Sequence, residues 1–158
     1  MKFLIKFVAL VTMLFSFSVY AGSHQKTIML STKGPGAGNP FWASVEAGAK
    51  DAAEEFGVNL IILSPPQESD VMAQVAQIED QIAKGVDGIA IAPTDPNAVA
   101  PILDDAIASG VPVVYIDTNG INEGVTFIGT NNINGAALAA RVLWGHKKEF
   151  SDLLNRGT

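Results

Sequence analysis

The sequence predicts an α/β fold, a doubly wound and mostly parallel sheet with helices on both faces. Short apolar runs typical of buried strands alternate with segments whose apolar residues recur every three or four positions, as they do in helices. The strand-like runs begin near residues 27, 58, 87 and 111, and this spacing is typical of βαβ units rather than hairpins. Right-handed crossovers between parallel strands would place helices on both faces of the sheet.

The individual elements follow from local patterns. Runs without polar alternation indicate strands that are covered on both faces, and glycine or proline marks most boundaries between segments. Gly57, for example, follows a helical pattern and suits the left-handed residue that ends many helices. The expected strands are 27–32, 58–63, 87–92, 111–116 and 125–129, and the expected helices are 41–56, about 70–84, 96–109 and a last one from near Asn134.

The N-terminus has the pattern of a secretory signal peptide over residues 1–21. Lys2 and Lys6 flank the start of an apolar run of 13 residues, 7–19, and small residues precede Gly22. A membrane-spanning helix needs about 20 apolar residues, so we expect cleavage, with a retained anchor as the alternative. We therefore expect an exported, periplasmic protein with no membrane insertion after cleavage.

Composition excludes several classes of function. The 158 residues carry a formal net charge of −6 and no cysteine. An acidic chain without a basic run argues against nucleic acid and anionic membranes as partners. Without cysteine there is no thiolate chemistry, no cysteine zinc site and no lipid anchor on cysteine. We expect no cofactor and no metal.

In parallel α/β sheets, ligands bind at the carboxyl ends of the strands, so the first candidates follow the first strand. The amide of Asn39 could bind a sugar hydroxyl, or it could cap the next helix with Pro40 at its first position. Phe41 shares a helical stripe with Val45 and is the expected core residue. Trp42 lies off that stripe and is the expected platform for a sugar ring.

Carboxylates at two later strand ends are further candidates. Asp117 ends the apolar run 111–116 and could accept two hydroxyl groups from one ligand, although it could instead cap the turn at Asn119. Asp95 could contact ligand, but it is a better N-cap for the helix that begins at Pro96.

Catalytic and nucleotide-binding motifs do not fit this sequence. The glycine-rich loop 34–38 matches neither G-x-G-x-x-G nor the P-loop. His24 and His146 have no nucleophile or acid at a catalytic spacing. We therefore expect no enzyme activity.

Four segments in a fixed order carry a family resemblance, which runs from Thr27 to about Leu143. The chain resembles the ribose/galactose/allose-type periplasmic solute-binding proteins of ABC sugar importers, which have the periplasmic binding protein type I fold. The segments are Asn39-Pro40-Phe41-Trp42, Gly85-Val86-Asp87-Gly88-Ile89 with Ala92-Pro93-Thr94-Asp95, 110–117, and Ile128-Gly129-Thr130-Asn131-Asn132.

The resemblance implies that two lobes close over a sugar and that a membrane permease reads the closed form. It matches Asn39, Phe41 and Trp42 to first-lobe ligand positions and Asp117 to the strand-end carboxylate. Thr118 stands where the ribose branch has arginine, which argues against ribose as the ligand and leaves other sugars and polyols open.

The resemblance also divides the chain. Residues 22–129 match an incomplete first lobe, and residues 130–158 begin a crossover to a second lobe and end in a divergent tail. Family members are roughly twice as long, so we expect this chain alone to bind sugar weakly or not at all. A periplasmic sensing module that presents ligand to a chemoreceptor or sensor kinase is the alternative function. A transcription regulator and a small flavodoxin-like enzyme are less favoured.

Overall fold

The computed structural model describes residues 25–156. The expected signal peptide, residues 1–21, lies outside the described residues.

A single parallel sheet forms the centre of the fold, which confirms the predicted α/β class. All four strand pairs are parallel, with Met29 of the central strand opposite Ile61 on one side and Ile89 on the other. The sheet order is β2-β1-β3-β4-β5. The strands are β1 (Thr27–Ser31), β2 (Asn59–Leu63), β3 (Gly88–Ile91), β4 (Val113–Ile116) and β5 (Thr126–Ile128).

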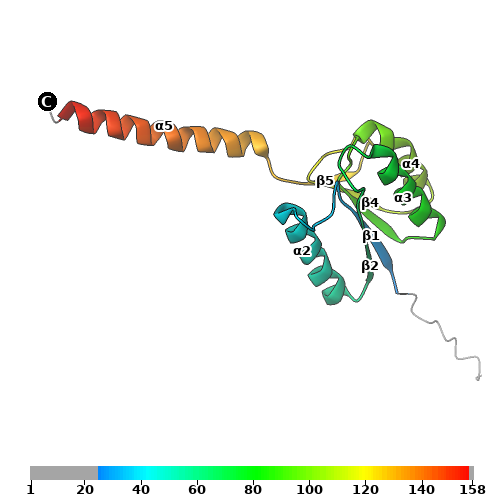
Figure 1. Ribbon diagram of the computed structural model, residues 1–158. Coiled ribbons are helices and arrows are strands. Elements are labelled where there is room, and N and C mark those ends of the chain that lie inside the picture. The colour runs from blue at the N-terminus through cyan, green and yellow to red at the C-terminus, as the bar shows by residue number, and fades with distance from the viewer. Residues whose placement is uncertain (1–24, 157–158) are drawn as a thin grey trace, which may run out of the picture.

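Helices cover both faces of the sheet, as predicted (Figure 1). Helix α2 (Pro40–Phe56) lies on one face, and helices α3 (Val71–Ala83) and α4 (Pro96–Ala108) pack side by side on the other. Each connects two parallel strands, neighbouring ones for α2 and α4 and, for α3, β2 and β3 on either side of β1, so every βα turn opens at the same edge of the sheet.

The main core lies between the sheet and the α3–α4 layer. Met29, Ile91 and Tyr115 contribute fully buried side chains from three adjacent strands. They pack with Ile78 of α3 and Leu103 of α4, which are also fully buried. This layer therefore fixes β1, β3 and β4 relative to one another.

Tyr115 also anchors the loop between β4 and β5. Its hydroxyl group donates a short hydrogen bond to Asn122 Oδ1. The Asn122 amide donates in turn to Asp104 Oδ1 at 2.6 Å and to the Ala100 carbonyl at 2.9 Å. Burial raises the pKa of the Tyr115 phenol, the Asn122 hydrogen bond opposes that shift, and the Asp104 carboxylate adds to it.

Gly120 is the residue of this loop that permits the Tyr115 contact. A Cβ atom at position 120 would lie 1.9 Å from the Tyr115 ring. We expect Gly120→Ala to lower the free energy of unfolding by about 1–3 kcal/mol, because the buried ring has no room to move. Urea unfolding measures the loss. Gly34→Ala is the control, since a Cβ there would meet nothing within 4 Å, and an equal loss in both variants would contradict the packing argument.

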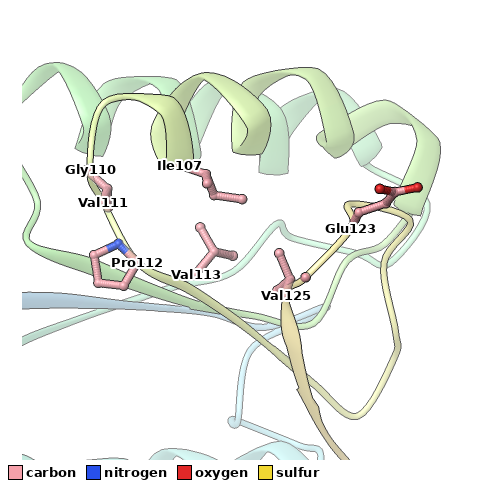
Figure 2. Close-up of a pocket in the computed structure, with 8 residues that line it drawn as sticks. Ile107, Gly110, Val111, Pro112, Val113, Glu123 and Val125 are labelled. Carbon is pink, nitrogen blue, oxygen red and sulfur yellow. The ribbon is translucent and has the colours of Figure 1, made fainter.

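A hollow of about 300 Å³ lies between α4 and the first residues of β4 and β5 (Figure 2). Ile107, Pro112, Val113 and Val125 line most of it, with Glu123 at its rim. Because Val113 begins β4 and Val125 precedes β5, this hollow lies at the opposite end of the strands from the predicted ligand site.

The last helix, α5 (Asn132–Arg156), extends away from the rest of the chain (Figure 1). It begins two residues before the predicted start, because Asn131 caps it: the Asn134 amide donates to Asn131 Oδ1 at 3.0 Å. No helix among the described residues, α5 included, has the length and apolarity that crossing a membrane requires.

Candidate ligand-binding site

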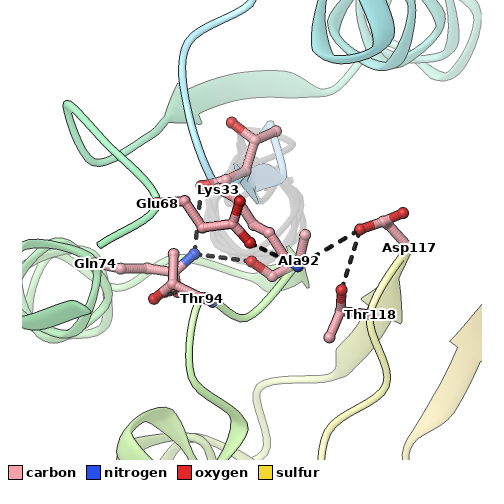
Figure 3. Close-up of polar contacts among 8 residues, drawn as sticks. Lys33, Glu68, Gln74, Ala92, Thr94, Asp117 and Thr118 are labelled. Carbon is pink, nitrogen blue, oxygen red and sulfur yellow. Dashed lines mark hydrogen bonds and ion pairs between the residues drawn. The ribbon is translucent and has the colours of Figure 1, made fainter. Parts of the chain in front are cut away.

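The carboxyl ends of β1, β3 and β4 bring the polar residues that follow them to one edge of the sheet (Figure 3). Lys33 follows β1, Thr94 follows β3, and Asp117 follows β4. Because these three strands are neighbours, segments more than eighty residues apart in sequence become adjacent. The predicted location of the site at the strand ends therefore contains a real polar cluster.

Lys33 lies at the centre of this cluster. Its ammonium group is 3.0 Å from Glu68 Oε1 and 3.9 Å from Asp117 Oδ2, and its side chain is only 16% exposed. The Thr118 hydroxyl donates to Asp117 Oδ2 at 3.1 Å. The cluster thus offers carboxylate acceptors beside ammonium and hydroxyl donors, the combination that hydrogen-bonds to a polyhydroxylated molecule.

The backbone of Asp117 is in the left-handed region, with φ at 58°, and it is the one described residue other than glycine with positive φ. Its amide still donates to the Ile128 carbonyl at 3.0 Å, so β5 holds it in place. Such conformations cost about 1–3 kcal/mol and concentrate at functional sites. The strained turn directs the Asp117 carboxylate toward Lys33, as Figure 3 shows.

Gln74 of α3 is a buried residue that ties two strand ends together. Its amide nitrogen donates to the Ser31 hydroxyl at 3.1 Å, to the Thr32 carbonyl at 3.3 Å and to the Ala92 carbonyl at 2.9 Å. Its amide oxygen accepts from the Thr94 amide at 2.8 Å and the Thr94 hydroxyl at 2.9 Å. One fully buried side chain therefore fixes how the β1 and β3 ends approach each other.

Sequence reasoning missed both Gln74 and the central position of Lys33. A signal for Gln74 existed, because it lies on the helical stripe with Val71 and Ile78, and a polar residue on a buried stripe needs hydrogen-bond partners. The pairing of Lys33 with Glu68 gave no local signal in the sequence.

Asn39 and Asp95 both cap helices. Asn39 Oδ1 accepts from the amides of Phe41 at 3.0 Å and Trp42 at 3.4 Å, with Pro40 at the first helical position. Asp95 Oδ1 accepts from the Asn97 amide at 2.8 Å. The predicted capping alternatives are confirmed for both, and ligand contact by either residue stays a prediction.

The burial of the two aromatic residues in α2 is the reverse of the prediction, and ligand contact by either stays a prediction. Trp42, the expected ligand platform, is only 6% exposed, whereas Phe41, the expected core residue, is 52% exposed. The rings meet edge to face with centroids 4.8 Å apart. The stripe argument failed because the covered face of α2 runs through Trp42, Val45 and Ala49, at spacings of three and four residues, and Phe41 lies outside it. Phe41 is therefore the exposed ring at this edge.

Metal-ligating side chains do not cluster in the part of the chain that the structure describes. No three His, Asp or Glu side chains there are close enough together to hold an ion.

The parallel sheet with polar residues at its strand ends is an arrangement typical of ligand-binding α/β proteins. Residues 33–149 match the family model for the periplasmic binding protein domain, and the solved structures that resemble the chain have the periplasmic binding protein type I fold. The chain belongs to the periplasmic binding protein domain family.

Relatives in this family are named for sugars. The chain is 36% identical over 103 residues to the ribose import binding protein of Bacillus subtilis, a match covering 65% of this chain and 33% of that protein. It is 32% identical over 114 residues to the D-ribose/D-allose-binding protein of Pseudomonas aeruginosa, over 66% and 36% of the two chains. The chain thus spans about a third of the length of these relatives.

Solved structures that resemble this chain also contain a sugar or are named for one. A periplasmic solute-binding protein of an ABC transporter from Actinobacillus succinogenes, with bound D-allose, superposes with a TM-score of 0.69 at 27% identity, covering 75% of this chain and 43% of that one. The arabinose-binding protein of Geobacillus stearothermophilus gives a TM-score of 0.69 at 30% identity, over 78% and 42% of the two chains.

Proposed function

We propose that this chain provides the first-lobe half of a sugar or polyol site in the substrate-binding component of a carbohydrate ABC importer. In this proposal the N-terminal segment directs export to the periplasm, and a membrane permease is the partner that receives the ligand. The names of the relatives and the polar composition of the site support a sugar or polyol.

The cluster of Lys33, Asp117 and Thr118 is the observation that carries the proposal. The Lys33 ammonium group and the Thr118 hydroxyl each lie within 4 Å of Asp117 Oδ2, which suits vicinal hydroxyl groups. Phe41 adds an exposed apolar face at the same edge, and such a face suits the C–H side of a sugar ring. The Lys33 ammonium group partly neutralises the carboxylates of Glu68 and Asp117, and the excess of carboxylate favours a ligand that donates hydrogen bonds over an anionic one.

The site is open to solvent, and this openness limits the affinity we propose for the chain alone. All of its groups come from one edge of one sheet, and Asp117 is 35% exposed. A ligand on this surface would keep much of its hydration, whereas typical small-molecule sites bury most of the ligand surface. We therefore propose dissociation constants of about a millimolar or weaker.

Calorimetric or NMR titration with pentoses, hexoses and polyols tests this proposal. We expect at least one sugar to shift amide resonances of residues 33, 94 and 117. Asp117→Asn should weaken that binding about tenfold or more, because hydrogen bonds to a charged group contribute about 1.5–3 kcal/mol. Asparagine tolerates the left-handed backbone that Asp117 adopts, so the variant should fold normally.

Two results would contradict the proposal. If no sugar or polyol shifts resonances at the strand ends, the site does not bind this class of ligand. Sub-micromolar binding by the monomeric chain would show instead that one lobe is sufficient, and would refute the half-site argument. Lys50→Gln, an exposed change on α2, is the matched control and should leave any binding unchanged.

A further inference from the structure

The chain turns sharply at Asp117, directly after β4. The Thr118 amide donates to the Ile116 carbonyl, and this hydrogen bond closes a three-residue turn around Asp117. With φ at 58° for the central residue, this is the γ-turn form that is rare and strained. The left-handed region is unfavourable for a residue with a Cβ atom, so contacts elsewhere in the chain must hold Asp117 in this conformation.

The parallel arrangement of β4 and β5 explains why the chain turns at this point. Because β5 is parallel to β4, it starts at the opposite edge of the sheet from the edge where β4 ends. The connecting segment, residues 117–125, therefore has to run back past the length of β4. An extended conformation at Asp117 would instead carry the chain outward beyond the sheet edge. The turn thus depends on where the returning segment is attached.

Asn122 attaches the returning segment both to α4 and to β4. Its amide nitrogen donates to the Ala100 carbonyl at 2.9 Å and to Asp104 Oδ1 at 2.6 Å, and both of these residues lie in α4. Its amide oxygen accepts from the hydroxyl group of Tyr115, a β4 residue whose side chain is fully buried. One side chain therefore fixes the path of the chain after the turn.

Residues 116–121 are consequently held at both ends by Tyr115, through its backbone on one side and its hydroxyl group on the other. Gly120 passes against the Tyr115 ring, where a Cβ atom would lie 1.9 Å from the ring, so the segment has little room to shift. The Asp117 amide also donates to the Ile128 carbonyl at 3.0 Å. That bond fixes the amide that precedes the φ rotation, and it does not by itself select a positive φ.

We infer that Asn122 is a positioning residue, which holds Asp117 in its strained turn and so places the Asp117 carboxylate beside Lys33. Asp117 Oδ2 lies 3.9 Å from Lys33 Nζ (Figure 3), and rotation about φ to a relaxed value would move the carboxylate away from this position. Asn122 acts through Asp117 and does not itself contact ligand. Its effect on ligand affinity rests on the proposed function, whereas its effect on the turn does not.

The preference for glycine over alanine at position 117 measures how firmly the turn is held. Asp117→Gly and Asp117→Ala both lack the carboxylate, but only alanine resists a positive φ. Urea unfolding gives the ratio of the folding equilibrium constants of the two variants. When both also carry Asn122→Ala, the turn can relax, and we expect this glycine-to-alanine ratio to fall about fivefold or more. The unfolded-state entropies of glycine and alanine differ, but that difference cancels between the two backgrounds.

Val99→Ala is the control background for this comparison. Val99 is fully buried in α4, so its truncation destabilises the chain without removing an Asn122 hydrogen bond, and the glycine-to-alanine ratio should stay unchanged. Tyr115→Phe removes only the hydroxyl group, keeps the ring against Gly120, and should lower the ratio as Asn122→Ala does. It decides the question if the Asn122→Ala chains do not fold. The inference is overturned if the ratio falls no further in these backgrounds than in Val99→Ala.

Sugar titration tests the consequence for the ligand site. With Asp117 in place, Asn122→Ala should weaken sugar binding to a similar extent as Asp117→Asn, while Val99→Ala should bind normally. A lowered glycine-to-alanine ratio with undiminished sugar affinity would overturn the positioning role, because Asn122 would then hold the turn without serving the site. If the natural chain binds no sugar, the proposed function fails, and the ratio alone decides whether Asn122 holds Asp117.

Discussion

Replacing Gln74 with methionine is expected to lower the free energy of unfolding by about 3 kcal/mol or more. Methionine matches the length of glutamine but cannot donate or accept as the amide does. The change leaves the Thr32 and Ala92 carbonyls and the Thr94 amide without this partner. Each buried polar group left unsatisfied costs about 1–3 kcal/mol, and the low local dielectric increases the cost. Urea unfolding followed by fluorescence measures the loss.

Gln77→Met, one turn further along α3, is a matched control. Gln77 donates one hydrogen bond, to the Ser64 carbonyl at 3.0 Å, and its own amide oxygen is buried without a partner in the described chain. Its replacement removes one contact and one unsatisfied acceptor, so we expect a change within about 1 kcal/mol. Equal losses in the two variants would mean that Gln74 contributes only helix packing and not the strand-end clamp.

The fold was predictable because each of its elements has a local cause. Gly57, with φ at 64°, ends α2 where the pattern indicates, and Pro96 opens α4 behind its aspartate cap. The predicted boundaries of helices and strands were less accurate where one residue contributes to the end of a helix and also lies in a strand-like run. Val111 is the first residue of the predicted strand, but its amide donates to the Ala106 carbonyl at 3.0 Å and completes the end of α4. Strand pairing of β4 accordingly begins at Val113.

The location of the site could be predicted from topology, but its contacts could not. That Asp117 lies at a strand end follows from the apolar run before it. The approach of Lys33 to both Asp117 and Glu68 depends on the order of strands in the sheet and on the path of two loops, and neither is encoded locally. Gln74 reaches the strand ends from a helix on one face, so only the packed structure reveals its partners.

Truncating Trp42 is the second change for which we expect a large effect, and it tests directly which of the two α2 rings belongs to the core. Trp42→Ala removes a side chain that is 6% exposed, and we expect the free energy of unfolding to fall by about 3–5 kcal/mol. Phe41→Ala removes a ring that is 52% exposed, and we expect a loss of about 1 kcal/mol, including the lost edge-to-face contact. Urea unfolding followed by circular dichroism measures both losses, since Trp42→Ala also removes a fluorophore.

Sugar titration tests which of the two rings, Phe41 or Trp42, contacts the ligand. If Phe41 is the ring that faces ligand, Phe41→Ala should weaken sugar binding several-fold while the protein stays folded. Phe41→Tyr, which keeps an aromatic face, should retain binding and serves as the control. Trp42→Phe keeps part of the buried volume and should bind sugar normally at reduced stability. A Trp42→Phe variant that is fully stable but has lost sugar binding would contradict this assignment. It would show that Trp42 is the ring that contacts the sugar and that its burial contributes little to stability.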